Sequence, residues 1–107
     1  MIQFQKLTST LVTSLLLTVA GSAMADDGAD AYTAKGCAAC HGADAKSPIM
    51  PLYPKIAGQS KEYLTQQMAD IKNGKRSNGM SGVMKGVMAG VSDDEITALA
   101  VYISGLK

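Results

Sequence analysis

Both cysteines and the single histidine of this 107-residue chain lie in one pentapeptide, Cys37-Ala38-Ala39-Cys40-His41. Two thiols at this spacing, followed at once by a histidine, form the pattern that attaches haem covalently, with the histidine as a ligand of the iron. If this pentapeptide holds haem, the chain has no cysteine left for a structural disulfide and no second histidine. Any other protein ligand of the iron must then be of a different type, and the seven methionines supply thioethers.

Two other functions also use a Cys-x-x-Cys pair. Thiol–disulfide exchange is typical of such a pair beside a βαβ pattern, and no such pattern follows here. A structural zinc site needs four ligands, and beyond Cys37, Cys40 and His41 only carboxylates remain to complete it. The pentapeptide therefore favours haem attachment.

The N-terminal stretch has the pattern of a secretory signal peptide. Lys6 precedes an uncharged, leucine-rich segment over residues 7–20, and Ala23-Met24-Ala25 then has the small-x-small spacing of a cleavage site. A transmembrane anchor is disfavoured because serines and threonines interrupt the apolar run, which is shorter than the ~20 residues that a spanning helix needs. We expect export to the periplasm and removal of residues 1–25, which leaves residues 26–107 as one small domain.

The mature chain has little aromatic material for a core. Phe4 leaves with the signal peptide, tryptophan is absent, and the aromatic residues that remain are Tyr32, Tyr53, Tyr63 and Tyr102. Small domains bury too little apolar surface to offset chain entropy easily, so a disulfide, a metal or a cofactor usually stabilises them. A haem at the centre would supply the missing apolar bulk.

The charge of the mature chain is balanced, with nine basic and nine acidic side chains once Lys6 has been removed. No basic patch interleaved with aromatic residues is present, so nucleic-acid binding is not expected. Basic residues that flank the haem motif and the later segments could steer the docking of a redox partner. They are Lys35, Lys46, Lys55, Lys72, Lys75, Arg76 and Lys85.

Helix signals predict an all-α domain. A first helix is expected over residues 27–35, with acidic residues at its start and Gly36 at its end. The prolines and glycines of residues 42–59 disfavour regular structure there. No segment shows the sustained alternation of a β-strand.

Two later helices have clearer boundaries. One is expected to begin after its N-cap Ser60 and to end at Asn73-Gly74. The last begins with the capping-box pair Ser92 and Glu95. Their predicted buried faces are Tyr63, Leu64, Met68 and Ile71 in the former and Ile96, Leu99, Ala100 and Ile103 in the latter.

Residues 75–91 are rich in glycine and methionine. Met80, Met84 and Met88 recur at every fourth position, which by itself favours one face of a helix. The four glycines of the segment oppose a helix, because each costs about 1 kcal/mol relative to alanine in a helix interior. We therefore expect a flexible loop that lies against a flat cofactor.

Taken in order, CAACHG, YPKIAGQSKEYL, the regularly spaced methionines and VSDDEITALAVYI resemble a class I c-type cytochrome. The chain is most similar to the small bacterial single-haem cytochromes related to each half of the periplasmic dihaem cytochromes. The resemblance implies three to four helices wrapped around one covalently bound haem c. It also implies that the first and last helices cross, with Gly28 and Tyr32 facing Leu99 and Tyr102.

The same resemblance implies the roles of residues around the haem motif. Cys37 and Cys40 attach the haem, and His41 is the proximal ligand of the iron. The carbonyl oxygen of Pro54 accepts a hydrogen bond from the other ring nitrogen of His41, which orients the imidazole.

Met84 is the distal iron ligand that the resemblance implies, with Met80 and Met88 as the alternatives. An iron with histidine and methionine ligands has no open site, so one-electron transfer is the expected chemistry and enzyme activity is not expected. The implied donor is a membrane quinol-oxidising complex or another cytochrome. The implied acceptor is a terminal oxidase or a periplasmic reductase or peroxidase. Docking to membrane complexes would be transient, and the protein is expected to be a monomer, with a dimer left open.

Two other functions stay open from the residues alone. Regularly spaced methionines are soft ligands, so a periplasmic copper(I) carrier would also use the methionine segment. A haem ligand sensor would use a methionine that an incoming ligand displaces from the iron.

Overall fold

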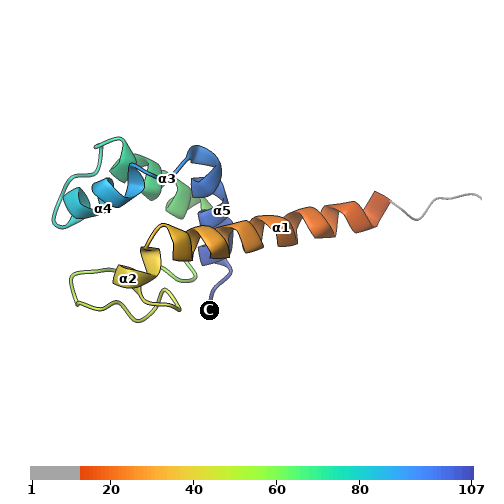
Figure 1. Cartoon of the computed structure of the whole chain (residues 1–107), viewed down its shortest axis with the longest axis horizontal. Coiled ribbons are helices and arrows are strands. Elements are labelled where there is room, and N and C mark those ends of the chain that lie inside the picture. Colours follow the sequence, from red (N-terminus) through yellow and green to blue (C-terminus); the bar gives the residue numbers. More distant parts are fainter. Residues whose placement is uncertain (1–12) are drawn as a thin grey trace, which may run out of the picture.

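The computed structural model describes residues 13–107, which form five helices and no β-strand. The helices are α1 (Thr13–Ala34), α2 (Cys37–His41), α3 (Lys61–Lys72), α4 (Ser81–Met88) and α5 (Asp93–Ser104) (Figure 1). The predicted all-α class is confirmed, with two more short helices, α2 and α4, than the three predicted from local signals. The expected signal peptide, residues 1–25, lies partly outside the described residues.

The first helix begins earlier than predicted. We expected a start near Asp27, but α1 runs without a break from Thr13 to Ala34, and its first half extends away from the other helices (Figure 1). The stretch before Asp27 is rich in alanine and leucine and has no proline, so nothing in the sequence interrupts the helix. Its end agrees with the prediction, because Gly36 follows in a left-handed conformation with φ of 80°. No helix of residues 13–107 is both long and apolar enough to cross a membrane.

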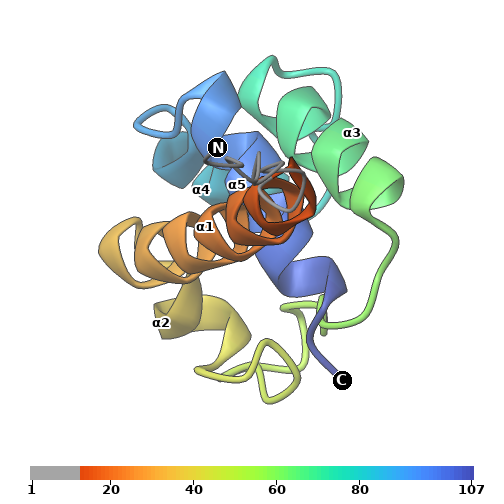
Figure 2. The same cartoon turned by 90° about the vertical axis from the view of Figure 1, so that its right-hand side faces the viewer.

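The helices α1 and α5 pack directly against each other, as Figure 2 shows from the end of α1. Gly28 permits this approach, because a Cβ atom there would overlap the carbonyl oxygen of Ala98 and the Cβ of Tyr102. One turn further on, the rings of Tyr32 and Tyr102 lie 5.7 Å apart at an interplanar angle of 55°. The predicted crossing of the first and last helices is confirmed, although the residues nearest to Gly28 are Ala98 and Tyr102, and Leu99 lines the cavity described below.

The helices α3 and α5 have the predicted caps. The Ser60 hydroxyl accepts a hydrogen bond from the Tyr63 amide, and Ser92 and Glu95 form a reciprocal capping box. Their apolar faces meet in the core, where the buried side chains include Leu64, Met68, Ile71, Ile96, Leu99, Ala100 and Ile103. Of the predicted buried residues only Tyr63 is exposed.

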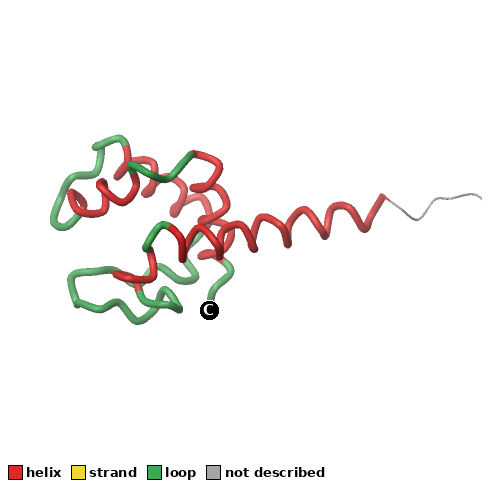
Figure 3. The backbone as a smooth tube through the Cα atoms, viewed as in Figure 1, coloured by secondary structure: helices red, strands yellow, loops and turns green. Residues whose placement is uncertain are grey.

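The methionine segment contains a helix, so the prediction of a loop over residues 75–91 is wrong for its centre. Ser81–Met88 forms α4, which packs against α3, and only the residues on either side are loop (Figure 3). The glycines that argued against a helix, Gly82 and Gly86, are exposed and have nothing within 4 Å of where a Cβ would lie. Their cost to the helix is offset on the opposite face, where Met88 is buried in the core and Met84 packs against it.

Candidate functional site

A cavity of about 440 Å³ separates α2 and the loop after it from α3 and α4. Its volume lies in the range of about 300–1,000 Å³ that is typical of small-molecule and cofactor sites. We call α2 with residues 42–59 the attachment wall, and α4 with the loops on either side of it the methionine wall. Most of the lining is apolar, and its buried apolar side chains are Leu64, Met68, Ile71, Met88, Leu99 and Ile103.

The two cysteines of the attachment wall are brought to the cavity by α2. Cys37 and Cys40 are one helical turn apart, so they lie on the same face of α2, and both line the cavity as half-buried free thiols. Burial raises the pKa of the Cys37 thiol. A raised pKa is the opposite of what a thiol–disulfide exchange site needs, since the thiolate is the reactive form.

His41 ends α2 and is buried at the cavity wall, with 6% of its surface exposed. Its Nδ1 lies 2.9 Å from the carbonyl oxygen of Pro54. Because a carbonyl can only accept, Nδ1 must carry the proton, and in the neutral ring Nε2 then has a free lone pair. The attachment wall therefore presents a nitrogen donor whose tautomer and orientation are fixed by a backbone group.

The turn after His41 depends on glycine and on a buried tyrosine. Gly42 has φ of 88° and ψ of 159°, a region of backbone conformation open essentially to glycine alone, and a Cβ there would overlap the backbone of Ser47. The Tyr32 hydroxyl donates a 2.6 Å hydrogen bond to the Gly42 carbonyl oxygen. Burial of Tyr32, reinforced by the neighbouring Cys37, raises the pKa of this phenol to about 12.

A second turn closes the attachment wall. One carboxylate oxygen of Asp44 accepts hydrogen bonds from the amides of Lys46 and Ser47, at 2.9 and 3.0 Å. The Lys46 amide contributes most to holding the pKa of Asp44 below its usual value. The carbonyl of the fully buried Ala45 then accepts from the amides of residues 56 and 57 at 2.9 and 3.1 Å. Every one of these bonds has a backbone group as donor or acceptor, so the wall is fixed largely through its own main chain.

All three candidate methionines line the same cavity from the methionine wall, but they differ in burial. Met80 is the N-cap of α4 and is 37% exposed. Met88 is 1% exposed and belongs to the core. Met84, between them, is half-buried and packs against the core cluster from the cavity side.

Every residue of the sequence-based site lines this one cavity, because Pro54 does so together with the two cysteines, the histidine and the three methionines. The structure also shows contacts within the protein for three of the basic residues that were considered for docking. Lys35 and Lys72 donate to backbone carbonyls of the loop between α4 and α5, and Arg76 donates to Gln67. Sequence reasoning missed these contacts because they join residues far apart in the chain.

The cavity fits a large, flat, apolar group that is joined to thiols on one side. The attachment wall carries Cys37, Cys40 and the buried imidazole of His41, the methionine wall carries thioether sulfurs, and apolar side chains line the space between them. The residues that the structure describes contain no cluster of three or more histidine, cysteine, aspartate or glutamate side chains that could hold a metal ion by itself.

Comparison with known proteins agrees with this geometry. The cytochrome c family model matches residues 25–107. Cytochrome c4 from Pseudomonas aeruginosa is 41% identical over 101 residues, which cover 91% of this chain and 48% of that protein. A thiosulfate dehydrogenase electron acceptor from Stutzerimonas stutzeri is 35% identical over 102 residues, covering 89% of this chain and 45% of that protein.

A solved structure is also similar. The crystal structure of reduced recombinant cytochrome c4 from Pseudomonas stutzeri matches 80% of this chain and 50% of that chain, with a TM-score of 0.71 and 32% sequence identity. The chain thus spans about half the length of the cytochrome c4 proteins that it matches.

Proposed function

Since the chain belongs to the cytochrome c family, as an electron carrier with covalently bound haem c, we propose that His41 and Met84 ligate its iron. Attachment is proposed at Cys37 and Cys40. The single observation that carries this proposal is that one apolar cavity is lined by these thiols, by a buried imidazole on the same wall and by Met84 on the other.

Haem iron with two protein ligands changes between the ferrous and ferric states without an open site for substrate. The residues of the attachment wall keep one ligand ready for it. The Pro54 carbonyl, 2.9 Å from His41 Nδ1, holds the ring so that Nε2 is the donor, and this hydrogen bond raises the donor strength of the imidazole.

The methionine wall supplies a soft thioether and lines the cavity with apolar side chains. Met84 is favoured over its neighbours because it is half-buried at the cavity surface, whereas Met80 stands exposed at the start of α4 and Met88 is enclosed in the core. Thioether ligation and an apolar surrounding both favour the ferrous state, since the ferric form carries one more positive charge.

The protein is proposed to act in the periplasm as a single domain over residues 26–107, after cleavage near Ala25. The donor is proposed to be a membrane quinol-oxidising complex or another cytochrome. The acceptor is proposed to be a terminal oxidase or a periplasmic reductase or peroxidase. The similarity to a thiosulfate dehydrogenase electron acceptor supports exchange of electrons with a redox protein.

Substitution of the three methionines tests the ligand assignment. The purified protein should stain for haem on a denaturing gel, and its ferric form should show the methionine-to-iron absorption band. Met84→Ala should abolish this band, while Met80→Ala and Met88→Ala should keep it. Loss of the band in Met80→Ala or Met88→Ala, with its retention in Met84→Ala, would overturn the assignment.

Binding of carbon monoxide distinguishes the carrier from a ligand sensor. Because the iron of the carrier is closed on both sides, the ferrous wild-type protein should bind carbon monoxide slowly and weakly, and Met84→Ala should bind it rapidly. Equally rapid binding by both proteins would contradict the carrier.

A further inference from the structure

The segment that presents Met84 needs support from the rest of the fold. With eight residues, two of them glycine, α4 is shorter than the ~12–15 residues at which isolated helices become even marginally stable. It packs against α3 and continues through residues 89–92 into α5. The position of Met84 therefore depends on what holds the C-terminal end of α4.

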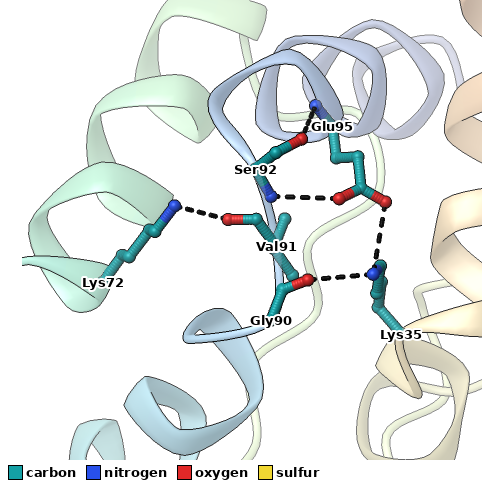
Figure 4. A network of polar contacts seen from close by, with 6 residues as sticks. All are labelled: Lys35, Lys72, Gly90, Val91, Ser92 and Glu95. Atoms are coloured by element: carbon teal, nitrogen blue, oxygen red, sulfur yellow. Dashed lines mark hydrogen bonds and ion pairs between the residues drawn. The ribbon is translucent and has the colours of Figure 1, made fainter.

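Two lysines from different parts of the chain bond to the loop at that end. Lys35, just after α1, donates to the carbonyl oxygen of Gly90 at 2.9 Å, and Lys72, the last residue of α3, donates to that of Val91 at 2.5 Å (Figure 4). The two acceptors are consecutive residues, so the loop after α4 is bonded from both sides. We call Lys35 and Lys72 the lysine pair.

Each ammonium group of the lysine pair also has a carboxylate nearby. Lys35 Nζ lies 3.4 Å from Glu95, whose other carboxylate oxygen accepts from the Ser92 amide in the capping box of α5 (Figure 4). Lys72 Nζ lies 3.8 Å from the exposed carboxylate of Asp93. Cations just beyond a helix C-terminus also interact favourably with its dipole and its last carbonyls. The lysine pair thus links α1, α3 and the start of α5 to the end of α4.

We propose that Lys35 and Lys72 are positioning residues for Met84, which keep its sulfur in the cavity by fixing the carbonyls of Gly90 and Val91. This inference rests on the ligation of iron by Met84 in the proposed function. Among the described residues, no other side chain distant in sequence donates a hydrogen bond to residues 77–91. Loss of either lysine lets the end of α4 fray, and the methionine then leaves the iron more often.

Competition by imidazole measures how often the methionine leaves. Imidazole added to the ferric protein can bind iron only where the methionine has dissociated, so its apparent affinity reports the displacement equilibrium. Lys35→Met and Lys72→Met keep the apolar stem and remove the charge and its donors. Each should raise the imidazole affinity roughly tenfold, the effect of losing one charge-assisted hydrogen bond, and the double variant should exceed both.

Two variants control for charge and for general stability. Lys61→Met removes the same charge from an exposed residue at the other end of α3 and should leave the imidazole affinity unchanged. Glu95→Gln removes the ion pair between α1 and α5 but keeps a capping-box side chain and the bond from Lys35 to Gly90. It should lower the free energy of unfolding in urea. Its effect on imidazole affinity should be less than half that of Lys35→Met.

The outcomes separate this inference from the proposed function. If the wild-type protein shows no methionine-to-iron band, ligation by Met84 is wrong. If the band is present and Lys35→Met and Lys72→Met bind imidazole no better than Lys61→Met, the positioning role is wrong and the ligation stands. An effect of Glu95→Gln as large as that of Lys35→Met would also overturn it, because the α1–α5 ion pair would then be the cause.

Discussion

The two walls of the cavity are held in place by different kinds of interaction. The attachment wall is fixed by backbone groups, among them the Gly42 turn, the Ala45 carbonyl and the bond from His41 to Pro54. The methionine wall is a short helix whose end is bonded by two distant side chains, Lys35 and Lys72. The attachment wall therefore depends mostly on bonds among its own residues, supplemented by the Tyr32 hydroxyl and by the bond from the Gly58 amide to Ile103. The end of the methionine wall depends instead on two side chains that lie 55 and 19 residues from their acceptors.

The largest expected effect tests the local character of the attachment wall. Gly42→Ala should cost about 3 kcal/mol or more in free energy of unfolding, because the side chain meets the Ser47 backbone in a conformation that only glycine adopts readily. Gly36→Ala is the matched control, since Gly36 also has positive φ but has nothing within 4 Å of its Cβ position. It should cost about 1 kcal/mol in the same urea titration. Equal losses in the two variants would mean that the Ser47 contact is unimportant.

The next effect concerns the hydrogen bond from Tyr32 to the attachment wall at high pH. The pKa of Tyr32 is raised from 10.0 to about 12 in the folded protein, so the unfolded chain loses this proton first. The stabilisation is complete below pH 10 and is lost as pH rises through 12, which should lower the free energy of unfolding by roughly 2–3 kcal/mol between these values. Urea titrations at pH 9 to 12 measure it.

Tyr32→Phe should remove this part of the pH dependence, while Tyr63→Phe, at an exposed tyrosine, should keep it. An identical decline in the wild-type protein and in Tyr32→Phe would show that other groups cause the loss at high pH. At neutral pH, Tyr32→Phe should cost about 1 kcal/mol for the lost hydrogen bond to Gly42.

The smallest effect has the opposite sign and belongs to the methionine wall. Gly86→Ala should raise the free energy of unfolding by up to about 1 kcal/mol, because Gly86 is inside α4, is exposed and has open space around its Cβ position. Its position away from the cavity lining means that the methionine-to-iron band should be unchanged. A lower free energy of unfolding in Gly86→Ala would show that α4 needs the flexibility of this glycine. That result would contradict the view that contacts from distant residues hold the methionine wall.

Local signals predicted those elements whose boundaries are set by neighbouring residues. Ser60 caps α3, and Ser92 with Glu95 caps α5, as their spacing indicated. The cavity-lining positions of Cys37, Cys40, His41 and Pro54 also agree with the sequence-based site, although their roles toward haem stay predictions. Such short-range patterns are readable because both partners lie within a few residues of each other or within one motif.

The errors concern elements whose stability comes from distant parts of the chain. The glycines of α4 argued for a loop, but the helix is supported by α3, by burial of Met88 and by the lysine pair, of which Lys35 lies 55 residues from Gly90. Helix propensity could not weigh these contacts. Similarly, nothing in the sequence separated Lys35 and Lys72 from the other basic residues considered for docking.

The contact of Gly28 with Ala98 and Tyr102 has a consequence for the order in which the protein matures. It joins helices from opposite ends of the described chain, so it cannot form before the C-terminal helix has been synthesised. Until α5 has been made and has met α1, the cavity has no complete enclosure, and the thiols of Cys37 and Cys40 are open to the surroundings. For the haem attachment proposed at these two thiols, the accessible state is therefore the one before the crossing forms, and the arrival of the C-terminal helix completes the enclosure.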